Sequence, residues 1–170
     1  LYVVFDDGAL DTGETPEARY AQPNQLADRA AASNTMRAET VGTAADGAPP
    51  VLMNAGTADA DHNGQIDTVT CTFSESLEIV DGAAADPLPG FEVAGYTVQD
   101  GDYAAAAATA VVLALVESGL ADTGALPAVS YDAAATDAAV DPAGHELLDG
   151  PAFLGTADGA HPVLLAALTA

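Results

Sequence analysis

Polar and apolar residues alternate most clearly in IDTVTCTFSE, residues 66–75. Val69, Cys71 and Phe73 fall on one side of this segment, and the intervening threonines fall on the other. A period of two residues is typical of a β-strand with one buried face. The pattern therefore predicts a half-buried strand here, with Cys71 as a buried and unreactive thiol.

Shorter apolar runs with strand character recur along the chain, and turn-rich segments containing Gly, Pro and Asp separate them. These runs are residues 1–5, 16–20, 50–56, 90–98, 109–117 and 127–131, with a further one near 146–155. Helical periodicity is weak throughout. About seven short strands in about 110 residues are typical of an immunoglobulin-like β-sandwich, so the sequence predicts an all-β fold of that class.

The chain contains an internal repeat. ADGAPPVLMNAGTA, residues 45–58, returns as ADGAHPVLLAALTA, residues 157–170. The aspartates of two DTG triplets, Asp11 and Asp122, lie 111 residues apart, and the first landmark gives a separation of 112. A period of this size corresponds to a whole domain, well above the repeat length of solenoid proteins.

The phase of the repeat predicts the domain organisation, because residue 1 aligns near Val112. Residues 1–47 are expected to carry the C-terminal strands of a preceding immunoglobulin-like repeat, 48–159 one complete repeat, and 160–170 the first strand of the next. We expect an interior window of a longer polypeptide whose partners are neighbouring repeats. The alternative is end-to-end self-association by strand complementation, in which the terminal strand of one chain completes the partial sandwich of another.

Composition narrows the classes of partner and environment. The chain has 26 acids, three arginines and no lysine, for a net charge of -23, yet 49% of its residues are hydrophobic. That apolar content favours a folded chain over a disordered one. In molar salt the Debye length falls to about 3 Å, which screens the self-repulsion, so a halophilic source is expected. The charge disfavours nucleic acid and anionic membranes and favours divalent cations.

The acidic segment DADHNGQID, residues 59–67, matches the first nine positions of a calcium loop, with Gly64 at the turn and Ile66 as an apolar anchor. Hard oxygen ligands at alternating positions around a glycine turn suit calcium. The predicted metal ligands are Asp59, Asp61, Asn63, Gln65 through its backbone carbonyl, and Asp67. The competing interpretation is an ordinary polar turn.

The match to a calcium loop ends at position twelve, where Thr70 replaces the bidentate Glu of an EF-hand. A helix-loop-helix EF-hand is therefore excluded, and a calcium loop between two strands is expected. Glu75 and Asp141 are the candidates for the missing carboxylate.

No catalytic constellation is evident. The DTG triplets at 11–13 and 122–124 match the aspartic protease triplet, but such a dyad needs two carboxylates in contact, and here they fall in consecutive repeats. Both triplets precede a Pro-containing turn, so turns are predicted for them. We find no nucleophile-base pair, phosphate loop or paired zinc ligands and expect a non-enzymatic protein.

These landmarks together resemble the immunoglobulin-like repeats of large bacterial and archaeal surface proteins and adhesins. In that family an acidic Asp-Asn-Gly loop runs into a "TFSE" strand and the repeat closes on "D-x-AGN". Residues 73–75 match the former, and residues 141–145 match the latter with His145 in place of Asn. The first copy departs from the closing motif, because residues 28–30 lack the Gly.

The resemblance implies an extracellular or cell-surface stalk, adhesin or filament segment, with calcium stiffening the joint to the preceding repeat. One alternative is a carbohydrate- or substrate-binding module of a secreted enzyme. The chain has no Trp, four Phe and five Tyr, which is few aromatics for a sugar-binding platform. A surface-layer lattice protein is a third expectation that differs from a stalk only in assembly geometry.

Overall fold

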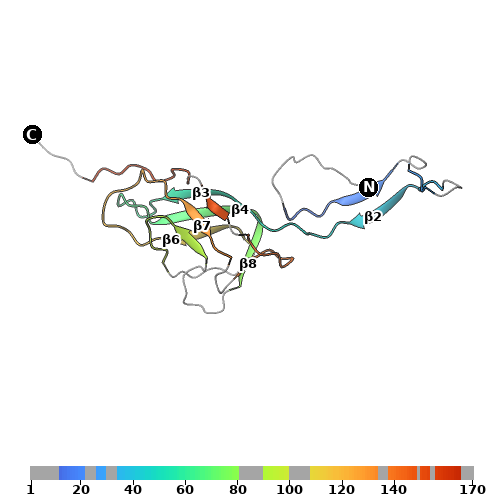
Figure 1. Cartoon of the computed structure of the whole chain (residues 1–170). Coiled ribbons are helices and arrows are strands. Elements are labelled where there is room, and N and C mark those ends of the chain that lie inside the picture. Colours follow the sequence, from blue (N-terminus) through green and yellow to red (C-terminus); the bar gives the residue numbers. More distant parts are fainter. Residues whose placement is uncertain are drawn as a thin grey trace, which may run out of the picture. The chain divides into compact units, whose positions relative to one another are not determined.

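The chain forms β-strands and no helix within the part that the structure, a computed structural model, describes (Figure 1). The described residues are 12–21, 26–29, 34–80, 90–99, 108–133, 138–148, 150–153 and 156–165. The chain divides into two compact units, Glu14–Gly47 and a larger one made of Leu1–Gly13 and Ala48–Ala170. The strand expected at residues 1–5 lies outside the described ranges.

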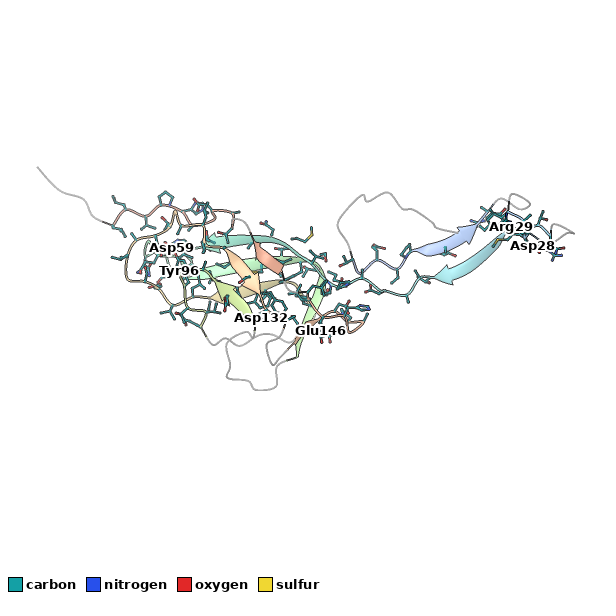
Figure 2. All side chains as sticks on the ribbon, viewed as in Figure 1. Asp28, Arg29, Asp59, Tyr96, Asp132 and Glu146 are labelled. Carbon is teal, nitrogen blue, oxygen red and sulfur yellow. The ribbon has the colours of Figure 1, made fainter. Side chains whose placement is uncertain are left out.

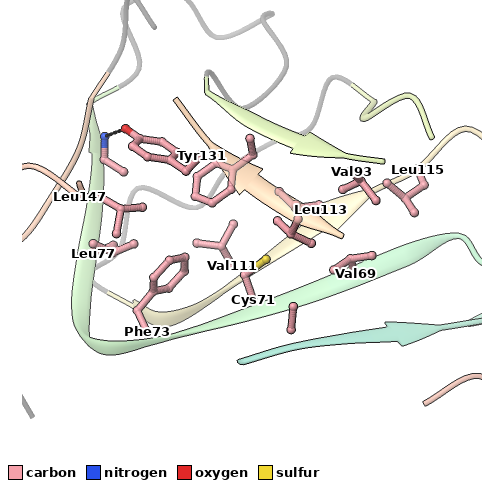
Figure 3. Close-up of a cluster of buried hydrophobic side chains, with 14 of the residues drawn as sticks. Val69, Cys71, Phe73, Leu77, Val93, Val111, Leu113, Leu115, Tyr131 and Leu147 are labelled. Carbon is pink, nitrogen blue, oxygen red and sulfur yellow. Dashed lines mark hydrogen bonds between the residues drawn. The ribbon is translucent and has the colours of Figure 1, made fainter. Parts of the chain in front are cut away.

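The first sheet of the larger unit is built on one long strand, β4 (Thr68–Val80). β4 pairs antiparallel with β3 (Leu52–Ala58) from Thr68 to Phe73, and with β6 (Ala108–Ala114) from Thr68 to Thr72 and again at Leu77. Its last residues, from Glu78 on, instead pair antiparallel with β8 (Ala138–Val140). One strand therefore takes part in three ladders, and Figure 3 shows that it bends before its last residues.

The second sheet consists of β5 (Phe91–Val93), β7 (Val129–Tyr131) and β9 (Gly150–Phe153), with β7 in the centre. The sheets are joined by one apolar core, much of which Figure 3 draws. Its largest members are Ile66, Val69, Phe73, Leu77, Phe91, Val93, Val111, Leu113, Leu115, Val129, Tyr131 and Leu147. The all-β class is confirmed, and the arrangement is consistent with a β-sandwich.

The alternation in β4 has the predicted outcome. Val69 and Cys71 are fully buried, Phe73 is 4% exposed, and Thr72 on the other face is exposed. The ring of Phe73 meets Phe91 of the second sheet edge-on, with centroids 6.2 Å apart. Burial raises the pKa of the Cys71 thiol to about 12, so the thiolate needed for reactivity is suppressed.

Within the larger unit, two strands differ from the sequence expectation, and β2 (Glu39–Thr43) of the smaller unit lies outside the expected ranges as well. The single strand expected over residues 90–98 is interrupted, since β5 ends at Val93 and a turn follows in which Gly95 has a positive φ of 84°. The chain then rejoins the sheet through one bridge, Val98 to Leu115. Strand β8 was not predicted, because three residues of Ala-Ala-Val carry no readable alternation.

The segment around Ala157 runs parallel to β3 and covers part of its free edge. Thr57 N–H donates to Ala157 O at 3.0 Å, and Ala157 N–H donates to Ala55 O at 2.7 Å. A Cβ on Gly159 would lie 2.4 Å from Thr57 O, so only glycine permits this approach. Pairing of this kind removes exposed edge groups that would otherwise template aggregation.

The smaller unit contains an antiparallel ribbon of β1 (Glu17–Tyr20) and β2 (Glu39–Thr43). Its pairing register coincides with that of β7 and β9. Ala18 pairs with Gly42 and Tyr20 with Glu39, and the residues 111 positions later form the pairs Val129–Phe153 and Tyr131–Gly150. Both ladders also shift register between these pairs, so the repeat seen in the sequence recurs as a repeated ladder.

A tyrosine contact recurs with the ladder. The hydroxyl of Tyr20 accepts a hydrogen bond from Leu26 N–H at 3.0 Å. In the larger unit the hydroxyl of Tyr131 accepts one from Ala139 N–H at 3.2 Å, which is drawn dashed in Figure 3. Each tyrosine thereby holds the segment that follows its own strand.

The turn after each tyrosine is also bonded in the same way. Asn34 donates its backbone N–H and its side-chain amide to the carboxylate of Asp28, both at 3.0 Å. His145 presents its backbone N–H at 2.8 Å and ring Nδ1 at 2.7 Å to the carboxylate of Asp141. Asn34 therefore takes the place of His145, with two more residues in the sequence between it and its aspartate. The departure from the motif at residues 28–30 keeps this bonded pair.

Candidate cation site

The acidic loop, residues 59–67, connects β3 to β4 and folds around its own carboxylates. Asp59 is 6% exposed, and its carboxylate accepts hydrogen bonds from Asn63 N–H at 3.1 Å and Gly64 N–H at 2.8 Å. The chain reverses at His62 and Gly64, whose φ angles are 62° and 94°. Gly64 suits that conformation because it has no Cβ.

Three carboxylates of the loop converge. Asp67 Oδ2 accepts from Ala60 N–H at 2.9 Å, and Asp61 Oδ1 accepts from Asn63 N–H at 3.1 Å. Asp59, Asp61 and Asp67 each offer one carboxylate oxygen, and these oxygens lie within 4.8 Å of one another. The structure thus brings together three of the predicted ligands in an acidic cluster that can hold a metal ion.

Two oxygens of the acidic loop are buried without a partner. Asp67 Oδ1 and Gln65 Oε1 have no hydrogen bond, and Thr156 Oγ1 is the one other buried side-chain atom in this condition among the described residues. Leaving a buried acceptor unpaired costs about 1–3 kcal/mol. A cation bound here would supply the missing interaction, since oxygens are the ligands that hard cations take.

A carboxylate that the sequence analysis missed lies against the loop. Glu117, which follows β6, accepts from Asn63 Nδ2 at 2.8 Å and from Gln65 Nε2 at 3.3 Å. It reaches the loop because Thr68, the first residue of β4, pairs with Ala114.

The two residues named for the missing carboxylate make other contacts. Glu75 accepts a hydrogen bond from Thr12 Oγ1, and Asp141 binds His145. No contact between either of them and the acidic loop is found among the described residues.

The second DTG triplet anchors the acidic loop. Asp122 Oδ1 accepts from Ile66 N–H at 2.7 Å and Oδ2 accepts from the hydroxyl of Tyr96 at 2.8 Å, while Asp122 N–H donates to Gly64 O at 3.0 Å. Burial, and then the hydrogen bond and negative charge of Asp122, raise the pKa of Tyr96 to about 12. The aspartate of this triplet therefore has a structural role, because it fixes the position of the acidic loop.

The acidic loop lies at the end of the larger unit where β3 finishes, which we call the loop end. Figure 2 shows Asp59 and Tyr96 together at this end. A Cβ on Gly64 would meet Leu165 Cδ2 at 2.9 Å, so the side chain of Leu165 lies against the loop. This position differs from the expected one near the joint to the preceding repeat. The loop lies beside the outgoing chain, because β3 carries the chain across the full sheet first.

The turn at residues 141–145, which we call the closing turn, forms a second polar centre. Asp141 is 1% exposed. Burial alone would raise the pKa of its carboxyl, but hydrogen bonds from His145 and Gly144 and the charge of His145 outweigh burial and hold that pKa below its ordinary value. The turn is therefore stabilised by an ionised aspartate.

No described helix is long and apolar enough to cross a membrane. Comparison with protein-family models, with curated proteins and with solved structures finds no match to this chain.

Proposed function

We propose that the chain is a segment of tandem immunoglobulin-like repeats that serves outside the cell as a stalk, adhesin or filament component and binds calcium in the acidic loop. The observation that carries the proposal is the recurrence, at one spacing of 111 residues, of the β-ladder pairs of β1–β2 in β7–β9. The tyrosine contact and the aspartate-bonded turn recur with them. Serial copies of one module are typical of extended architectural proteins.

Burial in the two copies supports a serial arrangement. Leu147 is 2% exposed in the core of the larger unit, whereas Met36, 111 residues earlier, is 38% exposed in the ribbon. A two-stranded ribbon is marginally stable on its own, and a sheet needs a second apolar layer. A further sheet of the β3–β4–β6 kind, from a neighbouring repeat, is the natural cover for the ribbon.

The donor set favours calcium over other metals. The acidic loop offers carboxylate and amide oxygens, and its cluster contains no Cys or His. Thiolate and imidazole ligands select zinc and copper, whereas calcium takes six to eight oxygens in flexible geometry. Magnesium demands a tighter octahedron, so discrimination between the two ions is expected. Weak affinity, about millimolar, suffices for occupancy outside the cell.

The charge supports an extracellular and saline setting. A net charge of -23 on 170 residues repels itself strongly in dilute buffer, and both molar salt and bound divalent cations relieve that repulsion.

Electron microscopy of the native material tests the architectural part of this proposal. The expected image is a beaded rod or fibre with a regular domain-sized spacing. Isolated single globules would contradict the proposal, and a two-dimensional sheet would favour the lattice alternative.

A further inference from the structure

The first DTG triplet makes a contact that the proposed function does not use. The hydroxyl of Thr12 lies 2.6 Å from Ser74 Oγ and also donates to Glu75 Oε1. A Cβ on Gly13 would lie 3.0 Å from Glu75 Oε2, so glycine allows the close approach. The Thr-Gly pair thus sits on the "TFSE" segment of β4.

This contact lies at the end of the sandwich opposite the acidic loop. Ser74 Oγ accepts a hydrogen bond from Val51 N–H at 2.9 Å, and Val51 immediately precedes β3. We call this the leading end, because β3 starts here and runs toward the loop end. Glu75 is 7% exposed, so its carboxylate is largely withdrawn from water beside the threonine hydroxyl.

The second Thr-Gly pair, Thr123 and Gly124, lies at the loop end. The preceding Asp122 is fixed to the acidic loop through Ile66 and Gly64, which sets the position of the pair. Gly124 is exposed, and nothing lies within 4 Å of where its Cβ would be. The Thr123 hydroxyl makes no hydrogen bond to any described residue. The second Thr-Gly pair is therefore open at the loop end, whereas the first pair contacts Ser74 and Glu75 at the leading end.

We propose that Thr123 and Gly124 form a docking surface for the leading end of a following sandwich, with the copy of Glu75 in that sandwich as its partner. The inference rests on the tandem repeats of the proposed function but not on calcium. Each sandwich carries both halves of a head-to-tail contact, the Thr-Gly pair at the loop end and the Ser-Glu pair at the leading end. Such heterologous contacts propagate along a series.

The path of the chain agrees with this docking. The side chain of Leu165 lies against Gly64, so Leu165, the last described residue, is at the same end that presents Thr123. A hydroxyl that donates to a carboxylate is a charge-assisted hydrogen bond, which is stronger than one between neutral groups. Asp122 joins this surface to the acidic loop, so the docking pair and the cation site share one support.

The test uses the whole chain extended after Ala170 by a second copy of residues 59–159, which continues the repeat because 160–170 aligns with 48–58. Residual dipolar couplings then report the relative orientation of the two sandwiches. We expect one common alignment in the extended chain. Thr123→Val, or Glu75→Gln in the added copy, should separate the two alignments, and the double variant should change them no further.

Thr97→Val is the matched control, since Thr97 is an exposed threonine outside the docking pair. It should leave the common alignment intact. If the added residues fold and Thr123→Val leaves the alignment unchanged, the docking inference is overturned and the tandem proposal stands. If the added residues fail to fold, the tandem proposal is wrong and the docking inference falls with it.

Discussion

The carboxylate of Asp122 accepts a hydrogen bond of 2.7 Å from the backbone N–H of Ile66, across 56 residues of sequence. Ile66 is fully buried and sits inside the acidic loop. The shape of the loop therefore depends on a residue that no local motif includes.

Asp122→Ala should destabilise the larger unit. It removes the acceptor for Ile66 N–H and for the Tyr96 hydroxyl, and losing such partners costs about 1–3 kcal/mol. Urea unfolding at neutral pH measures the change. Glu92→Ala, on an exposed position of β5, is the control and should shift the free energy of unfolding by less than about 0.5 kcal/mol.

The ionisation of Tyr96 should be delayed in the folded protein. Its pKa of about 12 lies above the value of about 10 for an unfolded chain. Protonated Tyr96 therefore contributes its full stability below about pH 10. This stability is lost as the pH rises from about 10 through 12. The ultraviolet titration of the parent minus that of Tyr96→Phe isolates this residue and should show a transition near pH 12. A difference transition at about pH 10, the ordinary value, would contradict the assignment.

Calcium should raise the melting temperature of the larger unit. The Asp67→Asn variant should need at least ten times more calcium for the same rise. Asp67 holds the loop through Ala60 N–H and carries an unpartnered buried oxygen. At a hundred times its dissociation constant, a ligand of the folded state stabilises by about 2.7 kcal/mol. Calorimetry with calcium, magnesium and a chelator measures this. Glu92→Gln removes one charge elsewhere and should respond like the parent, whereas an equal loss in both variants would indicate simple charge screening.

Leu113→Ala should cost about 2–5 kcal/mol, and Val112→Ala should be nearly neutral. The two residues are neighbours on β6, but Leu113 is fully buried and Val112 is 54% exposed. Denaturant unfolding of both variants measures the difference. Equal costs would mean that β6 does not present alternate faces to core and solvent.

His145→Asn should retain most of the stability of the closing turn, since Asn34 makes the equivalent contacts to Asp28. His145→Ala removes the ring contact to Asp141 and should cost about 1 kcal/mol. The lowered pKa of Asp141 adds stability at pH above the ordinary value of the carboxyl, and this is lost as the pH falls through the folded value. Unfolding at neutral and acidic pH should show a smaller acid loss in His145→Ala, and an unchanged loss would contradict this assignment.

Features that depend only on the order of residues within a short segment could be predicted from the sequence. Alternation from Val69 to Phe73 identified the central strand, and the spacing of Asp59, Asp61 and Asp67 identified a cluster that the fold does assemble. Both signals lie within one short segment, where the backbone alone fixes which side chains share a face.

The sequence did not reveal the support around the acidic loop. Glu117 and Asp122 reach the loop across 54 and 56 residues of chain, and Tyr96 bonds to Asp122 across 26. Their positions follow from sheet pairing that no single segment encodes. The DTG triplet was expected to form a turn, but its carboxylate acquires a specific role only when β4 and β6 lie side by side.

The parallel contact between β3 and Ala157 has a mechanical consequence. The strand that brings the chain into the sandwich and the segment that takes it out run side by side in the same direction, joined by the hydrogen bonds between Thr57, Ala157 and Ala55. A pulling force applied along the polypeptide drags these two segments in opposite directions and loads the bonds in shear, so that they must break together. A string of such sandwiches under tension would resist extension at this seam while the rest of each core stays unloaded.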